Sequence, residues 1–202
     1  MRQGAIGYPQ GDIRVWAPAY TPFMVDSTFS AWPCSVARAM DVLSDPWSVL
    51  ILRDSYHGLT RFEEFHMSLG VSRTTLARRL RSLVAAGMLK RHAYQENPPR
   101  EEYLLTQMGT EFFGVTVVLL AWGDRWLGRG KGAPVVLRHR TCGNTIEPRV
   151  ACGACGEDVA LHDVDFDVGP GFPGRVAPRF DYRTRFARRA QRGPAQPGTA
   201  TV

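Results

Sequence analysis

The chain has 202 residues, of which 44% are hydrophobic and 22% are charged, and its formal net charge is +6. These proportions are typical of one or two globular domains with a buried core and exclude a chain that is disordered throughout. The longest apolar run, near residues 115–122, is too short to span a membrane, and the opening residues carry no secretory signal, so we expect a cytoplasmic protein.

The first 33 residues are rich in Gly, Pro and scattered aromatic residues without a period, which predicts a flexible N-terminal arm. Met1 and Met24 are both candidate translation starts within it. Periodic apolar positions then run from residue 34 to residue 127 and predict the main domain.

The main domain opens with three predicted helices. Apolar spacing predicts the first over 35–43. Asp45 and Pro46 supply an N-cap and a first-turn proline for a second helix over 47–55. A short third helix is predicted over 61–67.

A fourth helix, over 72–86, has the pattern of a recognition helix. Ser72 is a good N-cap, and leucines at helical spacing form a stripe that is expected to be buried. Another face presents arginines, threonine and alanine, which suit insertion into the major groove of DNA. No acidic residue occurs between Phe65 and Gln95, so this near-neutral domain is locally basic.

Two strands follow, over 88–94 and 101–105, joined by a loop that contains Pro98 and Pro99. A helix followed by a hairpin describes a winged helix, with a wing over 88–105 that can reach the DNA backbone or minor groove. The candidate DNA-binding residues are Ser72, Arg73, Thr74, Thr75, Arg78, Arg81, Lys90, Arg91 and Arg100. Within this set the best candidates for base edges are Arg73, Thr74 and Arg78, and those for phosphates are Arg81, Lys90 and Arg91. The alternative is a solvated helix face, in an interaction adaptor without sequence-specific DNA binding.

Thr106 begins a final predicted helix that runs to about Leu127 and is apolar around most of its circumference. One side of such a helix can pack on its own domain, and the other needs a partner, which predicts a dimerisation helix. The alternative is a central core helix in a monomer.

Short stretches of the main domain also stand in a recognisable order: Asp45-Pro-Trp47, Arg61-Phe62-Glu-Glu-Phe65, Val71-Ser-Arg-Thr-Thr-Leu76, Pro98-Pro-Arg100-Glu-Glu-Tyr103 and Ala121-Trp122-Gly123. Together, residues 34–123 resemble the HxlR family of bacterial winged helix-turn-helix transcriptional regulators. The resemblance implies a homodimer built mainly from the first and last helices, with operator binding by the fourth helix and the wing. We expect a repressor that responds to a small-molecule or redox effector.

Cys34 lies at the start of the first helix, where a helix N-terminus lowers the pKa of a thiol. Some members of the family it resembles sense oxidants through a cysteine at this position, so Cys34 is a candidate redox sensor. The alternative is a small buried hydrophobic residue.

The other cysteines cluster after a Gly-rich hinge, in a module over 128–168. Two turns, His139-Arg-Thr-Cys142-Gly and Cys152-Gly-Ala-Cys155-Gly, each offer two ligands three residues apart. Two such turns facing each other complete a tetrahedral zinc site, which would stabilise a segment too small to fold unaided. His162 is a possible substitute ligand; the alternatives are a Cys152–Cys155 redox pair or idle thiols.

Residues 169–202 contain seven arginines against Asp181 alone, so the positive charge of the chain is concentrated here. Their Pro-, Gly- and Arg-rich composition predicts a disordered basic tail that adds phosphate affinity independent of DNA sequence. The five histidines are scattered and no catalytic motif is present, so we expect no enzyme activity. The sequence thus predicts a mostly helical α+β fold: a winged helix-turn-helix domain with a long dimerisation helix, then a small β-rich zinc-ribbon-like module.

Overall fold

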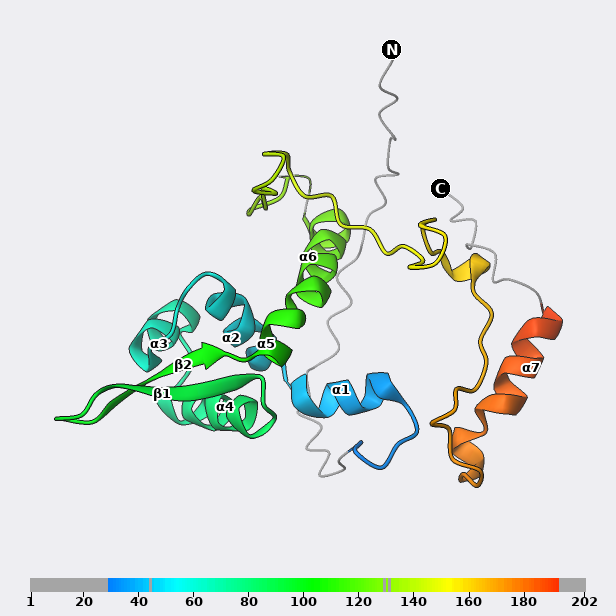
Figure 1. Ribbon diagram of the computed structural model, residues 1–202, viewed down its shortest axis with the longest axis horizontal. Helices are drawn as coiled ribbons and strands as arrows, with labels where there is room; N and C mark the ends of the chain where they lie inside the picture. Colours follow the sequence, from blue (N-terminus) through cyan, green and yellow to red (C-terminus); the bar gives the residue numbers. More distant parts are fainter. Residues whose placement is uncertain (1–28, 44, 129, 131, 193–202) are drawn as a thin grey trace, which may run out of the picture.

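The computed structural model describes residues 29–43, 45–128, 130 and 132–192 (Figure 1). The predicted N-terminal arm up to residue 28 and the predicted tail from residue 193 lie outside these residues. The elements in chain order are α1 (Ser35–Leu43), α2 (Pro46–Tyr56), α3 (Phe62–Leu69), α4 (Arg73–Ala85), β1 (Leu89–Gln95), β2 (Arg100–Leu105), α5 (Gln107–Glu111), α6 (Phe113–Leu127), the 3-10 turns η1 (Leu161–Asp163) and η2 (Pro178–Phe180), and α7 (Tyr182–Arg192). None of the described helices is long and apolar enough to cross a bilayer.

One hydrophobic core lies where α2, α3 and α4 meet the base of the hairpin. Its fully buried side chains include Ile51, Leu52, Phe65, Leu76, Leu80 and Leu83. The predicted leucine stripe of α4 is therefore confirmed, and it leaves the opposite face of this helix toward solvent. Burial of these large side chains, each contributing about 1.5–3 kcal/mol, fixes the orientation of α4.

Local signals set the ends of these helices. Asp45 accepts a hydrogen bond from the backbone N–H of Ser48 and caps α2, while Ser72 accepts one from Thr75 and caps α4. Between α3 and α4 the chain turns at Gly70, whose φ of 62° favours glycine. The two helices therefore form a helix-turn-helix.

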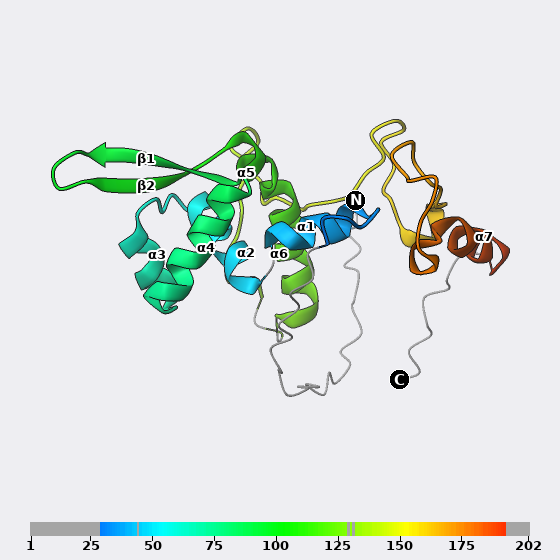
Figure 2. The same ribbon diagram turned by 90° about the horizontal axis from the view of Figure 1, so that it is seen from below.

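The hairpin pairs β1 with β2 antiparallel, from Leu89 opposite Leu105 to Gln95 opposite Arg100. Tyr103 N–H also donates to the carbonyl of Thr60 at 2.7 Å, beside a bridge between Arg61 and Glu102. The loop before α3 thus borders the sheet and holds the hairpin against the helices. Figure 2 shows the hairpin projecting beyond α3 and α4 as a wing.

The single long helix predicted over 106–127 is divided at Phe112 into α5 and α6. Thr106 caps α5 by accepting from the N–H of Gly109, and its own hydroxyl donates to the Gly87 carbonyl. A Cβ at Gly109 would collide with the carbonyl oxygen of Met88. This close approach, which a sequence period does not reveal, fixes α5 directly against the base of the wing.

Residues 132–192, here called the C-terminal arm, leave the end of α6 and run away from the winged helix (Figure 1). The prediction of a β-rich module is wrong at the level of strands, since the described residues of 128–168 contain only single bridges at Arg138–Thr145 and Ala151–Asp158. Each bridge instead closes a tight turn at one of the two cysteine motifs. The segment is too short to pair longer strands with one another.

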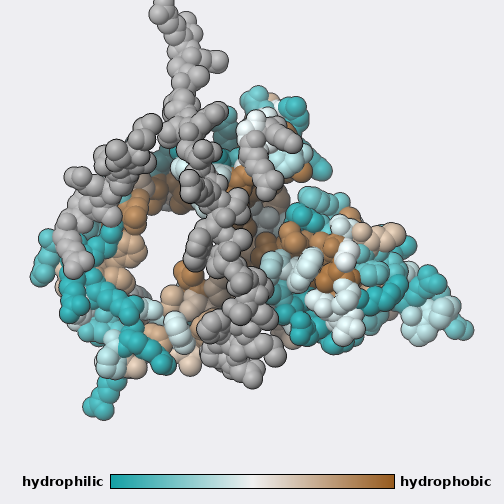
Figure 3. Space-filling view, turned by 180° about the vertical axis from the view of Figure 1, so that it is seen from behind, coloured by the Kyte–Doolittle hydropathy of each residue, from teal (hydrophilic) through white to brown (hydrophobic). Residues whose placement is uncertain are grey.

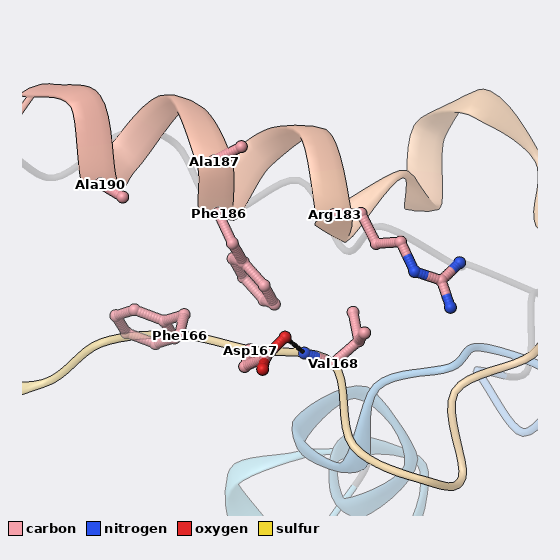
Figure 4. Close-up of a pocket in the computed structure, with 7 residues that line it drawn as sticks. All are labelled: Phe166, Asp167, Val168, Arg183, Phe186, Ala187 and Ala190. Carbon is pink, nitrogen blue, oxygen red and sulfur yellow. Dashed lines mark hydrogen bonds between the residues drawn. The ribbon is translucent and has the colours of Figure 1, made fainter.

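The predicted disorder of the basic tail is also wrong for residues 178–192, which form η2 and α7. Tyr182 and Phe186, four residues apart, form an aromatic stripe on α7 that packs on Phe166 and Phe172 at centroid distances of 5.6 Å. Figure 4 shows the shallow groove between this helix and residues 166–168. The four-residue spacing of Tyr182 and Phe186 is typical of a helix with a packing face, whereas the high arginine content of the segment is typical of disorder.

Candidate nucleic-acid interface

The exposed face of α4 carries most of the predicted DNA-binding residues. Arg73, Thr74, Arg78 and Arg81 are all exposed, while Thr75 is half-buried and its hydroxyl accepts from Ser72 at 3.0 Å. Ser72 and Thr75 therefore cap the N-terminal end of α4, where backbone N–H groups and the helix dipole favour an anion such as phosphate.

Arg73 forms an ion pair with a neighbouring helix. Its guanidinium makes two parallel 2.7 Å hydrogen bonds with the carboxylate of Glu63 on α3, and it lies 5.7 Å from the ring centroid of Phe62. The hydrogen bond from Arg73 lowers the pKa of Glu63 below its ordinary value. Both side chains stay about 60% exposed, which places the pair on the surface rather than in the core.

Arg78 and Arg81 make no ion pair within the described residues, in contrast to Arg73. Arg79, one position along, points the other way and pairs with Asp45 at the start of α2, where both side chains are largely buried. The locally basic stretch thus loses one cation to the packing of α4 on α2. The spacing of α4 separates these roles, because residues 78 and 79 lie about 100° apart on a helix.

The wing adds three predicted cations. Lys90, Arg91 and Arg100 are all exposed, and Arg91 pairs loosely with Glu101 across the strands at 3.5 Å. Lys90 and Arg91 are consecutive in β1, so their side chains lie on opposite faces of the hairpin. Only one of them can face a duplex that contacts one side of the wing.

Sequence reasoning missed Arg61, which lies beside the wing. Its guanidinium is exposed and sits 4.7 Å from the ring centroid of Tyr94 on β1. No local motif marks this arginine, because its neighbour in space is 33 positions further along the chain. It places another cation next to the wing.

Cys34 is half-buried at the N-terminal end of α1. A hydrogen bond from the Ala37 N–H lowers the pKa of its thiol, although partial burial opposes the shift; Tyr182 of α7 and Val36 N–H act in the same direction as Ala37. The N-terminal thiol and the C-terminal helix, far apart in sequence, are therefore in contact.

The two cysteine turns have the same backbone geometry, thirteen residues apart. In the first, Gly143 N–H donates to the His139 carbonyl at 2.7 Å; in the second, Gly156 N–H donates to the Cys152 carbonyl at 2.8 Å. Both glycines have positive φ, at 73° and 79°. Each turn brings its own pair of predicted ligands together, with the Cys142 sulfur 3.4 Å from His139 Nδ1. Within the described parts of the chain, no three His, Cys, Asp or Glu side chains converge closely enough to hold an ion.

Helices α2, α3 and α4 packed around one core, with one face of α4 toward solvent and a hairpin wing beside it, define a winged helix-turn-helix DNA-binding domain. The model of the HxlR-like helix-turn-helix family matches residues 42–131. The uncharacterized HTH-type transcriptional regulator Rv3095 of Mycobacterium tuberculosis is 43% identical over 143 residues, which are 71% of this chain and 90% of that protein. The chain belongs to the HxlR-like family of transcriptional regulators, and it is a DNA-binding regulator rather than an enzyme.

Solved structures agree with this assignment. The crystal structure of PA1607, described as a candidate transcription factor, matches with a TM-score of 0.64 and 35% identity, over 70% of this chain and 99% of that one. PA1374 from Pseudomonas aeruginosa matches with a TM-score of 0.50 and 35% identity, over 74% of this chain and 99% of that one. Residues 1–127 are too few to account for 70% of this chain, so the likeness to PA1607 extends into the segment that follows α6.

Proposed function

We propose that the protein represses transcription by binding operator DNA as a cytoplasmic homodimer, with α4 in the major groove and the wing on the adjacent backbone or minor groove. The observation that carries this proposal is the exposed face of α4, where Thr74, Arg78 and Arg81 project from a helix fixed by its buried leucines. Arg78 is our first candidate for a base edge, and Arg81 for a phosphate.

A gel shift on DNA upstream of the protein's own gene tests this assignment. Arg78→Ala should weaken operator binding by about 1–3 kcal/mol and relax preference at one base position. Arg81→Ala should weaken binding to all sequences alike. Unchanged operator binding in both variants, with the circular dichroism of the folded protein, would favour the interaction adaptor instead.

The homodimer is supported by a stripe of exposed apolar side chains on α6. Val115, Val118, Leu119, Trp122 and Trp126 recur at helical spacing and are between 40% and 56% exposed. On α1, Val36 and Met40 form a similar exposed pair one turn apart. Apolar stripes of this size on two helices are typical of subunit interfaces. Sedimentation equilibrium should give twice the chain mass, and Trp122→Glu should return the protein to one chain.

The C-terminal arm is proposed to bind one zinc ion through His139, Cys142, Cys152 and Cys155. The matched turns support this assignment, because each already presents two ligands of the type that zinc prefers on a tight turn closed by glycine. Binding requires the two turns to come together, so the metal would also fold this part of the arm.

Metal analysis of the purified protein tests the zinc site. We expect about one zinc per chain, its loss in Cys142→Ser and in Cys155→Ser, and its retention in the matched control Cys34→Ser. His162→Gln should also keep the metal unless His162 replaces His139 as the fourth ligand. A metal-free protein with a Cys152–Cys155 disulfide would support the redox pair instead.

Cys34 is proposed as the site through which an oxidant or electrophile changes DNA affinity. Its lowered pKa supports a reactive thiolate, and its contact with Tyr182 gives modification a structural consequence. Diamide should release the wild-type protein from DNA and leave Cys34→Ser bound. A Cys34→Ser variant that still responds would exclude the role.

A further inference from the structure

We propose that the C-terminal arm, residues 132–192, closes over a second copy of this chain. The inference rests on the homodimer proposed above and assigns a partner surface to the arm.

The arm does not form a core of its own. Among its described side chains, Phe180 alone is buried, and it packs on Trp32, which precedes α1. Large apolar residues stay 41–58% exposed along its length: Val135, Val136, Val150, Val159, Leu161 and Phe166. A segment of this length with one buried side chain has too small a core to be stable by its own contacts. The proposed zinc ion would stabilise the two cysteine turns, but it would leave the apolar side chains of the arm exposed, and a partner surface would cover them.

The path of the arm leaves space in which the apolar surface of a partner could cover its exposed side chains. The arm departs from the end of α6 and returns to the start of α1, where Phe180 lies 4.9 Å from Trp32 by ring centroids and Tyr182 contacts Cys34. Figure 3 shows an opening between the arm and the winged helix, with hydrophobic residues beside it. The exposed apolar side chains of the arm are thus accessible to another molecule.

A second copy supplies the complementary surface. The exposed stripe of α6 and the exposed pair on α1 belong to the proposed dimer interface, and the exposed Val135 and Val136 at the start of the arm follow the end of α6 by only eight residues. In a two-fold dimer each subunit presents both an arm and a stripe, so the two can cover each other reciprocally.

The first test compares dimer affinity in full-length variants. The double variant Val150→Glu and Leu161→Glu places charges at arm positions that are more than half exposed in one chain, so the subunit itself should fold normally. The matched control is Gln191→Glu, an exposed polar position of the same arm. We expect the double variant to raise the dimer dissociation constant at least tenfold and the control to leave it unchanged; equal constants would overturn the proposal.

The second test identifies which chain the arm touches. A photoreactive Leu161→p-benzoylphenylalanine protein is mixed and refolded with ¹⁵N-labelled wild-type protein, then irradiated and digested. We expect cross-links from the unlabelled arm to labelled peptides of α1 or α6. Cross-links confined to unlabelled peptides within a dimer would overturn the arm proposal alone, whereas a wild-type protein that binds operator DNA as a monomer would overturn the homodimer itself.

Discussion

At the scale of single residues, the arginines of α4 differ in whether they form ion pairs with carboxylates of the same chain. Arg79 forms a largely buried ion pair with Asp45, and Arg73 forms an exposed one with Glu63. Arg78 forms no ion pair within the described residues. Composition alone counts these side chains as equal cations. Their different partners give Arg79 a packing role and leave Arg73 and Arg78 on the exposed surface, where we propose that they contact DNA.

Glu63→Gln tests the shared arginine. Removing the carboxylate charge frees Arg73 for a nearby phosphate, so binding to non-operator DNA should strengthen and the slope of log affinity against log salt should steepen by about one phosphate contact. Filter binding over a salt series measures both quantities. The control is Glu111→Gln, an exposed acid on α5 that is bonded to Gln107 rather than to an arginine; a salt slope equal to this control would show that Arg73 does not reach phosphate.

Tyr182→Phe tests the contact between Cys34 and α7. The tyrosine hydroxyl helps to lower the pKa of Cys34, so its removal should raise that pKa and reduce the thiolate present at neutral pH. The rate of Cys34 alkylation by iodoacetamide should then fall near pH 7 and converge with the wild-type rate at alkaline pH, where both thiols are ionised. An unchanged rate profile would show that the helix N-terminus alone sets the reactivity.

At the scale of elements, helix positions in the winged helix followed from sequence signals that act over a few residues. The N-caps at Asp45 and Ser72 and the leucine stripe of α4 were sufficient to place α2 and α4 within one or two residues. The break at Phe112 was missed because the apolar period continues through it, and the close approach of Gly109 to Met88 was missed because that contact is distant in sequence. The ion pair of Arg79 with Asp45 and the contact of Arg61 with Tyr94 were missed for the same reason, because each joins residues that are far apart in sequence.

A pair of glycine substitutions tests the tight approach of α5. Gly109→Ala places a Cβ against the Met88 carbonyl and should lower the free energy of unfolding by about 1–3 kcal/mol. Gly114→Ala, in the first turn of α6, meets open space and should raise it by up to about 1 kcal/mol, because alanine favours a helix. Urea denaturation measures both, and equal effects would contradict the packing described for Gly109.

At the scale of the whole molecule, the excess positive charge lies on α7 and the turns before it, opposite the wing in Figure 1. The arginines of α7 include exposed ones at Arg183, Arg185 and Arg188. We propose that this segment supplies affinity for phosphate that is independent of DNA sequence, while α4 reads the bases. The fold of this segment was not predicted, because its composition is typical of disorder while two aromatic residues give it a packing face.

Neutralising two arginines of α7 tests whether this helix adds DNA affinity that is independent of sequence. Arg185→Gln with Arg188→Gln should weaken binding to operator and non-operator DNA by the same factor, with a reduced salt slope. The ratio of the two affinities should stay constant, which competition gel shifts measure. The matched control Thr184→Gln leaves the charge intact, and a changed ratio in the double variant would place α7 in sequence readout.

The junction at Thr106 has a mechanical consequence. The strand β2 runs into α5 through this residue, and its hydroxyl donates a hydrogen bond to the Gly87 carbonyl, so we expect a rotation of α5 to tilt the wing with it. The seven residues of β1 span about 23 Å, so a 10° rotation of the junction would move the wing tip by about 4 Å, roughly the rise of one base pair. An effector that alters how two subunits meet would thereby change the half-site spacing that the dimer fits, without touching any residue that contacts DNA.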